Sequence, residues 1–152
     1  MQRKKNMWLV SACLIGRKCK YNGGDNDNEL IRRYYDKGIL IPVCPEMDGG
    51  LPCPRIPCEV QGDKVIDQEG NDRTANYIKG AQIALQTALE HKCDMAVLKA
   101  KSPSCGCHMI YDGTFTHTLI EGKGITARML EENGIHCIDE NEFAEMVKGK
   151  EI

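Results

Sequence analysis

The chain has 152 residues, of which 41% are hydrophobic and 28% charged, and its formal net charge is −2. A chain of this length is expected to bury one core, so we predict a single domain over residues 1–152. Twenty basic residues against 22 acidic ones give no basic surface for a nucleic acid polymer, and no apolar run is as long as a membrane span. A small molecule is therefore the expected partner, and the oligomeric state stays open.

Nine cysteines are the outlier in this composition. A secreted disulfide scaffold is usually smaller, and an odd count leaves one thiol unpaired. The N-terminus resembles the leader of an exported lipoprotein, with basic residues at 3–5 and an apolar run before Cys13, but such leaders need an apolar core of about 7 to 15 residues and this run is shorter. We therefore expect a cytoplasmic protein with reduced thiols.

The first half of the chain is expected to alternate between strand and helix. An apolar run at 8–10 predicts a buried strand, followed by a loop over 14–24. An amphipathic stretch through 30–35 predicts a helix, and a second strand is expected at 39–43. Four prolines within 45–58 predict an irregular loop, because proline interrupts helices and strands alike.

The middle of the chain contains a predicted hairpin, a long helix and a third strand. The hairpin covers 60–66 and turns at Gly62-Asp63. The helix covers 74–91, and the third strand is expected at 95–99. An apolar stripe is expected to turn this helix toward the sheet, through Ile78, Ala81, Leu85, Ala88 and Leu89.

The last third is expected to hold a hairpin over 109–118 that turns at Asp112-Gly113, a helix at 125–132 and a fourth strand at 135–138. A closing helix contains the apolar residues Phe143, Met146 and Val147. Strands that alternate with helices indicate an α/β fold with a mainly parallel sheet and helices on both faces.

Three of these strands are each followed by a cysteine, namely Cys13, Cys44 and Cys105. In an open α/β sheet the ligand crevice lies beyond the carboxyl ends of the strands, so we expect these thiols to meet there. Cys-x-x-Cys does not occur, which argues against zinc ribbons and thioredoxin-like pairs. Soft thiolates select iron-sulfur clusters, zinc or copper(I), although a lone cysteine at a strand end is most often a small buried side chain.

Other polar side chains have two interpretations. Glu46 is either a solvated loop carboxylate or a general acid or base beside a metal. Ser102 and Ser104 are turn hydroxyls by default, and Arg55 either clamps an anionic group or lies on the surface. Core positions are expected for Cys93 and Cys137. The roles of four loop cysteines stay open, Cys19, Cys53, Cys58 and Cys107. The histidines are expected to be surface or structural residues, His91, His108, His117 and His136.

Four segments together resemble one bacterial family. They are Val10-Ser11-Ala12-Cys13-Leu14, Pro42-Val43-Cys44-Pro45-Glu46, Gly50-Leu51-Pro52 with Pro54-Arg55, and Leu98-Lys99 through Ser102-Pro103-Ser104-Cys105-Gly106. In this order they are similar to the thiouracil desulfidase family, and the similarity covers nearly the whole chain. The resemblance implies an enzyme that removes sulfur from a thiolated pyrimidine without a redox change, with water replacing the sulfur.

The resemblance also implies a cofactor and roles for individual residues. The cofactor is a 4Fe-4S cluster with one iron open to the substrate sulfur, held by Cys13, Cys44 and Cys105. Catalytic roles are implied for Glu46 and Ser102, and we expect substrate contacts from Arg55 and Ser104. The substrate is a thiouracil or a thiouridine nucleotide with its phosphate near Arg55 or Lys101.

Two alternatives from other classes stay open. A sulfur or metal carrier would use the same three cysteines without hydrolysing anything. A structural zinc domain that binds a partner protein would close the site with a fourth ligand such as Cys107.

Overall fold

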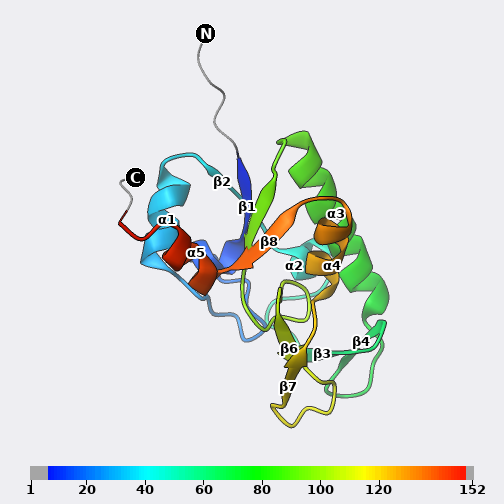
Figure 1. The fold of residues 1–152 in the computed structure, drawn as a ribbon. Helices are drawn as coiled ribbons and strands as arrows, with labels where there is room; N and C mark the ends of the chain where they lie inside the picture. Colours follow the sequence, from blue (N-terminus) through cyan, green and yellow to red (C-terminus); the bar gives the residue numbers. More distant parts are fainter. Residues whose placement is uncertain (1–6, 150–152) are drawn as a thin grey trace.

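The computed structural model describes residues 7–149, and a four-stranded sheet lies at the centre of the fold (Figure 1). Its strands are β1 (Trp8–Ser11), β2 (Leu40–Val43), β5 (Met95–Leu98) and β8 (His136–Asp139). All neighbours pair in parallel, in the order β2-β1-β5-β8. The predicted strands agree with these bounds to within one residue. The basic residues at 3–5 lie outside the described part of the chain.

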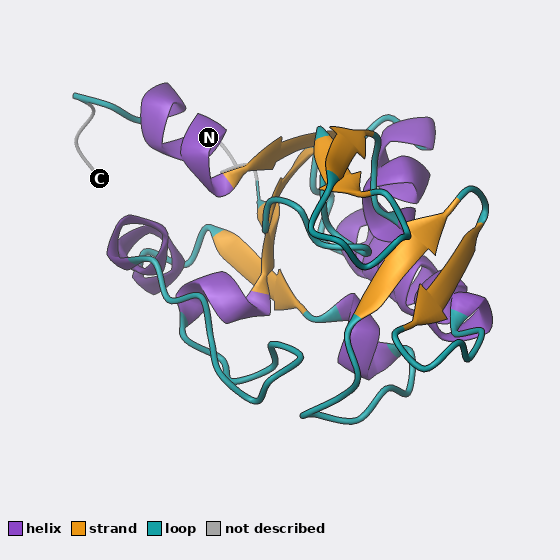
Figure 2. Cartoon of the chain, turned by 90° about the horizontal axis from the view of Figure 1, so that it is seen from below, coloured by secondary structure: helices purple, strands orange, loops and turns teal. Residues whose placement is uncertain are grey.

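Helices cover both faces of the sheet (Figures 1 and 2). One face carries α1 (Glu29–Asp36) and α5 (Glu140–Met146), and the other carries α3 (Thr74–Glu90) and α4 (Ile125–Glu132). Alternate strand residues supply the two cores, with Val10 and Val97 on the α1 and α5 side and Leu9 and Ala96 on the α3 and α4 side. The predicted α/β architecture is confirmed. Within residues 7–149 no helix is long and apolar enough to cross a bilayer.

The long helix α3 buries only part of the predicted stripe. Ile78 and Leu89 are 40% and 60% exposed. The buried residues of the helix are mostly small, namely Tyr77, Gly80, Ala81, Ala84 and Ala88. The predicted stripe is confirmed at Ala81 and Ala88 and wrong at Ile78 and Leu89. It followed the large aliphatic residues, whereas small ones let neighbouring elements approach closely.

A short helix, α2 (Pro45–Asp48), begins the stretch that was predicted to be irregular. Pro45 is its first residue, where the missing N–H of proline costs no hydrogen bond. A Cβ atom at Gly80 of α3 would lie 1.9 Å from the carbonyl oxygen of Pro45, so α2 sits directly on α3. Glu46 follows Pro45 and is therefore fixed relative to α3. The prediction of a loop holds for the rest of the stretch.

Two hairpins lie outside the central sheet. The first pairs β3 (Cys58–Gln61) with β4 (Lys64–Asp67) and confirms the predicted turn at Gly62-Asp63. The second pairs β6 (Met109–Tyr111) with β7 (Leu119–Glu121). The predicted tight turn at Asp112-Gly113 is wrong, because the connection runs over residues 112–118. Gly113 is instead held against β3, where Gln61 Nε2 donates to its carbonyl oxygen over 2.8 Å.

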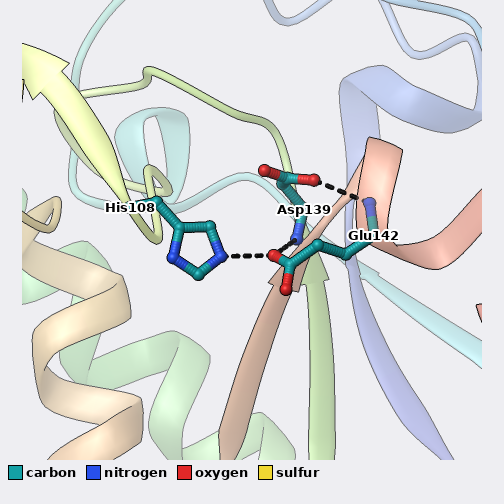
Figure 3. A group of neighbouring side chains, drawn as sticks. All are labelled: His108, Asp139 and Glu142. Atoms are coloured by element: carbon teal, nitrogen blue, oxygen red, sulfur yellow. Dashed lines mark hydrogen bonds and ion pairs between the residues drawn. The ribbon is translucent and has the colours of Figure 1, made fainter. Parts of the chain in front are cut away.

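The start of α5 is tied to the loop that carries Cys107 (Figure 3). Asp139 caps the helix and forms a capping box with Glu142. His108 forms an ion pair with Glu142 as well. The ligand atoms of these three residues lie within 4.8 Å of one another. The carboxylates are already engaged with the helix N–H groups and with the imidazole, so the contact has a structural role, in line with the prediction for His108.

Candidate active site

A cavity of about 520 Å³ lies beyond the carboxyl ends of β1, β2 and β5. Its lining includes six of the predicted site residues, Cys13, Cys44, Glu46, Arg55, Ser102 and Cys105. Because β1 lies between β2 and β5, the segments that follow these strands meet at one edge of the sheet. The three cysteines that are distant in sequence therefore share one cavity.

Tight local structure fixes each cysteine. Cys13 lies in the 3-10 turn η1 (Ala12–Ile15), which follows β1 directly. Cys44 follows β2 and is the N-cap residue of α2. Cys105 donates its backbone N–H to Ser102 Oγ over 3.0 Å. A Cβ atom at Gly106 would lie 2.8 Å from the Ser102 carbonyl oxygen, so this loop closes only with glycine after Cys105.

Cys13 and Cys105 each accept a hydrogen bond on sulfur. Asn26 Nδ2 donates to Cys13 Sγ over 3.3 Å, and the Ser11 hydroxyl donates to the sulfur of Cys105. Burial raises the pKa of both thiols, and these hydrogen bonds offset part of the rise because they favour the thiolate. Neither Ser11 nor Asn26 was predicted to support the site. Ser11 lies on the strand that carries Cys13, but nothing in the sequence pairs it with Cys105.

Cys44 is the thiol that ionises most readily of the three. A hydrogen bond from the Cys19 thiol lowers the pKa of Cys44 to about 7 and outweighs burial. The backbone N–H of Met47 also favours the thiolate, although its geometry falls short of a capping hydrogen bond. The same hydrogen bond raises the pKa of Cys19, which keeps the shared proton. A bound metal deprotonates its thiol ligands outright, so this donor set suits a cationic group.

The cysteine sulfurs are too widely spaced for a single ion. Within residues 7–149, no three thiols have their sulfurs all within 4.8 Å of one another. Tetrahedral zinc with Zn–S bonds near 2.3 Å brings its sulfurs to about 3.8 Å apart. Cys107, the fourth ligand of the zinc alternative, is 2% exposed and packs in the core instead of lining the cavity. The arrangement therefore fits a larger soft-metal group better than closed zinc.

Glu46 is held beside the thiols by two donors that share one of its oxygens. The Tyr77 hydroxyl donates to Glu46 Oε2 over 2.6 Å, and Arg55 Nε donates to the same oxygen over 3.3 Å. Burial, with the charge of Glu46 added, raises the pKa of Tyr77 well above its usual value, so the phenol keeps its proton and acts as the donor. Because both donors hold Oε2, Oε1 is the oxygen available to a group in the cavity.

The guanidinium of Arg55 is turned toward the protein. Its side chain is 5% exposed. Besides Glu46, it donates to the carbonyl oxygens of Pro52 and Cys19, over 3.3 and 3.0 Å. Arg55 thus positions Glu46 and the segment that carries Cys19. A substrate contact by Arg55 stays a prediction.

Ser102 and Ser104 have different surroundings. Ser102 lines the cavity, and its Oγ accepts from the backbone N–H groups of Ser104 and Cys105, over 3.1 and 3.0 Å. With both lone pairs engaged, its hydroxyl hydrogen is what Ser102 offers to the cavity. Ser104 is fully buried, and its hydroxyl bonds to Thr126 Oγ1 over 2.7 Å. This hydroxyl therefore fixes the loop to α4, and a substrate contact by Ser104 stays a prediction.

All nine cysteines are free thiols. Cys93 and Cys137 lie in the core, as predicted. Of the loop cysteines whose roles were left open, Cys19 is 2% exposed and lines the cavity beside Cys44, and Cys58 lines the cavity as well. Cys53 Sγ lies 3.3 Å from each of two backbone carbonyl oxygens, those of Lys18 and Lys20.

Three thiols that meet beside a fixed carboxylate at the carboxyl edge of a parallel α/β sheet form a donor set that suits a soft metal, in the crevice where α/β proteins bind their ligands. The family model described as 2-thiouracil desulfurase matches residues 8–142. The chain therefore belongs to the 2-thiouracil desulfurase family, a family of enzymes. This membership confirms the resemblance seen in the sequence.

Two similar proteins cover almost the whole chain. The uncharacterized protein YbbK of Bacillus subtilis (strain 168) is 38% identical over 151 residues, which span 93% of this chain and all of that protein. The solved structure of the 4Fe-4S-dependent thiouracil desulfidase TudS superposes with a TM-score of 0.90 at 36% identity, over 94% of this chain and 96% of that one.

Proposed function

We propose that this protein is a 4Fe-4S-dependent desulfidase that replaces the sulfur of a thiolated pyrimidine with oxygen from water. The single observation that carries the proposal is the cavity in which Cys13, Cys44 and Cys105 lie beside a fixed carboxylate. The family of the chain and the name of its solved relative point to the same reaction and the same cofactor.

The residues present suit the cluster. Cys13, Cys44 and Cys105 would hold it, since soft thiolates are its usual ligands and the sulfurs are spaced more widely than one ion needs. When bound, the cluster supplies a Lewis acid for the thiocarbonyl sulfur and an acceptor for the sulfide released. Hydrogen bonds from Asn26 and Ser11 to two of the ligand sulfurs would stabilise the thiolates and tune the bound group.

Glu46 and Ser102 have separate proposed roles in the reaction, as proton acceptor and as hydrogen-bond donor. Glu46 Oε1 would take the proton of the attacking water, because Oε2 is held by Tyr77 and Arg55. Ser102 would donate its hydroxyl hydrogen to the water or to the substrate, because its lone pairs already accept two backbone N–H groups. A fixed base and a fixed donor on the same cavity lower the barrier mainly by orientation.

The carrier alternative gives Glu46 no chemical role. Carriage of sulfide by the three cysteines requires no base, whereas Glu46 is oriented by two buried donors that such a role leaves unexplained. The enzyme is therefore the function we favour. A nucleotide substrate would place its phosphate near Lys101, which lines the cavity, while the donors of Arg55 face protein atoms.

The test is sulfide release from 2-thiouracil and from a thiouridine nucleotide by protein reconstituted anaerobically with iron and sulfide. We expect release by the wild type and by Glu90→Gln, an exposed carboxylate at the end of α3. Glu46→Gln should keep the visible absorption of the cluster and lose turnover. Equal turnover by Glu46→Gln and the wild type would exclude Glu46 as the base, and a coloured wild type that releases no sulfide would favour the carrier.

A further inference from the structure

The connection between β6 and β7 contributes an aromatic wall to the cavity. Tyr111, Phe115 and His117 line the cavity. The threonines that alternate with them are exposed, and their hydroxyls bond to one another in a row, over 2.6 Å from Thr114 to Thr116 and 2.8 Å from Thr116 to Thr118. The two sets therefore face opposite sides of the connection, and the aromatic set faces the cavity.

Side chains of β3 hold this connection in place. Glu59, which is 8% exposed, accepts the backbone N–H groups of Gly113 and Phe115 on the same oxygen, over 3.0 and 3.1 Å. A Cβ atom at Gly113 would lie 2.5 Å from Gln61 Cγ, so the connection passes close against β3. Because Glu59 holds the backbone on both sides of residue 114, the aromatic wall is a preformed surface.

The backbone of the wall adopts a conformation that L-residues seldom take. Phe115 and His117 both have φ of 59°, in the left-handed region. Lys101, which also lines the cavity, has φ of 69° and forms a bridge with Ile110 of β6. Such conformations persist where the surrounding structure enforces them, and they are concentrated at ligand sites.

We propose that Phe115 and His117 recognise the pyrimidine ring, Phe115 by covering the face of the ring and His117 by selecting among groups attached to it. Phe115 is half-buried, and aromatic side chains bind planar bases by stacking. His117 is exposed and lines the cavity, and its ring forms a T-shaped pair with that of Tyr111, with centroids 6.1 Å apart. The proposal rests on the proposed function and adds to it the residues that bind the ring, as distinct from those that react with its sulfur.

The test is equilibrium dialysis of 2-thiouracil under anaerobic conditions, on reconstituted protein that carries Glu46→Gln so that the ligand is not consumed. Adding Phe115→Ala should raise the dissociation constant about tenfold or more. Phe115→Leu, which keeps the apolar bulk and guards against a folding defect, should weaken binding as well. His117→Ala should change the ratio of the dissociation constants for 2-thiouracil and 2-thiouridine by about fivefold. Thr116→Ala, on the opposite side of the same connection, is the matched control and should bind like the parent.

Dissociation constants within twofold of the parent for both Phe115 variants would overturn the proposal, and so would equal weakening by Thr116→Ala. A parent that binds no 2-thiouracil would overturn it as well. Sulfide release by the wild-type protein is measured separately. If the wild type releases no sulfide but ring binding still depends on Phe115, the desulfidase is excluded and the ring site stands. If the wild type releases sulfide but ring binding does not depend on Phe115, the ring site is excluded and the desulfidase stands.

Discussion

Tyr77 on α3 donates its hydroxyl hydrogen to Oε2 of Glu46 on α2, over 2.6 Å, although the two residues are 31 positions apart in the sequence. Tyr77 is 1% exposed, so the donor of this hydrogen bond lies in the core while its acceptor lines the cavity. Together with Arg55 it determines which carboxylate oxygen faces the cavity. The orientation of the proposed base thus depends on the packing of two helices.

Tyr77→Phe removes that donor and leaves the ring in place. We expect kcat for sulfide release to fall about tenfold, with KM nearly unchanged, because a misoriented base affects the chemical step more than binding. Steady-state kinetics on reconstituted protein measure both constants. Tyr34→Phe, a buried tyrosine on the other face of the sheet, is the control and should leave kcat unchanged. Equal kcat values for Tyr77→Phe and the wild type would show that Arg55 alone orients Glu46.

Gly80→Ala tests the contact between α3 and α2. The added Cβ would lie 1.9 Å from the Pro45 carbonyl oxygen, so α2 has to move, and Glu46 moves with it. We expect the free energy of unfolding to fall by about 1–3 kcal/mol and sulfide release to fall as well. Urea denaturation and the sulfide assay report the two effects. Gln82→Ala on the exposed face of α3 should change neither, and a Gly80→Ala protein of wild-type stability would contradict the close packing.

The two loop serines should respond differently to alanine. Ser102→Ala leaves the backbone N–H groups of Ser104 and Cys105 without their acceptor, so both cluster retention and turnover should fall. Ser104→Ala breaks only the buried bond to Thr126 and should cost about 1–2 kcal/mol of stability while turnover per folded molecule stays at the wild-type value. Thermal melts and the sulfide assay separate the two. The reverse pattern would place the active hydroxyl at Ser104.

The carboxylate of Asp67 is expected to make the free energy of unfolding depend on pH in the acid range. Burial on its own would raise its pKa, but hydrogen bonds from Asn71, Arg73 and Glu69 outweigh burial and lower it below the model-peptide value of 3.8. A depressed folded-state pKa stabilises the protein above pH 3.8, and this contribution is lost as the pH falls through the folded-state value. The stability difference between the wild type and Asp67→Asn should therefore be full at neutral pH and shrink in acid. Urea titrations at several pH values measure it, and a difference that does not depend on pH would contradict the role of the carboxylate.

Local sequence patterns were sufficient for the sheet and for the edge where the thiols gather. Continuous apolar runs such as Met95–Leu98 indicate strands buried on both faces, and parallel strands bring their carboxyl ends together. That rule places Cys13 and Cys44, which lie in the turns directly after β1 and β2, whereas Cys105 also depends on the loop that Ser102 holds.

Contacts between elements could not be predicted in the same way. The buried face of α3 includes Gly80 and Ala84, small residues that the predicted stripe of mainly aliphatic side chains missed. The bond from Tyr77 to Glu46 depends on how α2 is placed on α3, and that placement depends on the missing side chain of Gly80. The wall at Phe115 depends on Glu59, a charged residue whose burial has no local signal.

Cys13, Cys44 and Cys105 are the proposed ligands of a 4Fe-4S cluster, and the iron and acid-labile sulfide content of anaerobically reconstituted protein tests this assignment. We expect about four irons and four sulfides per chain in the wild type and in Cys93→Ala, whose thiol lies in the core. Each of Cys13→Ala, Cys44→Ala and Cys105→Ala should lose most of that iron. A full complement of iron in any one of these three variants would show that the mutated cysteine is not a ligand, and a wild type that binds zinc and no iron would show that the protein holds no 4Fe-4S cluster.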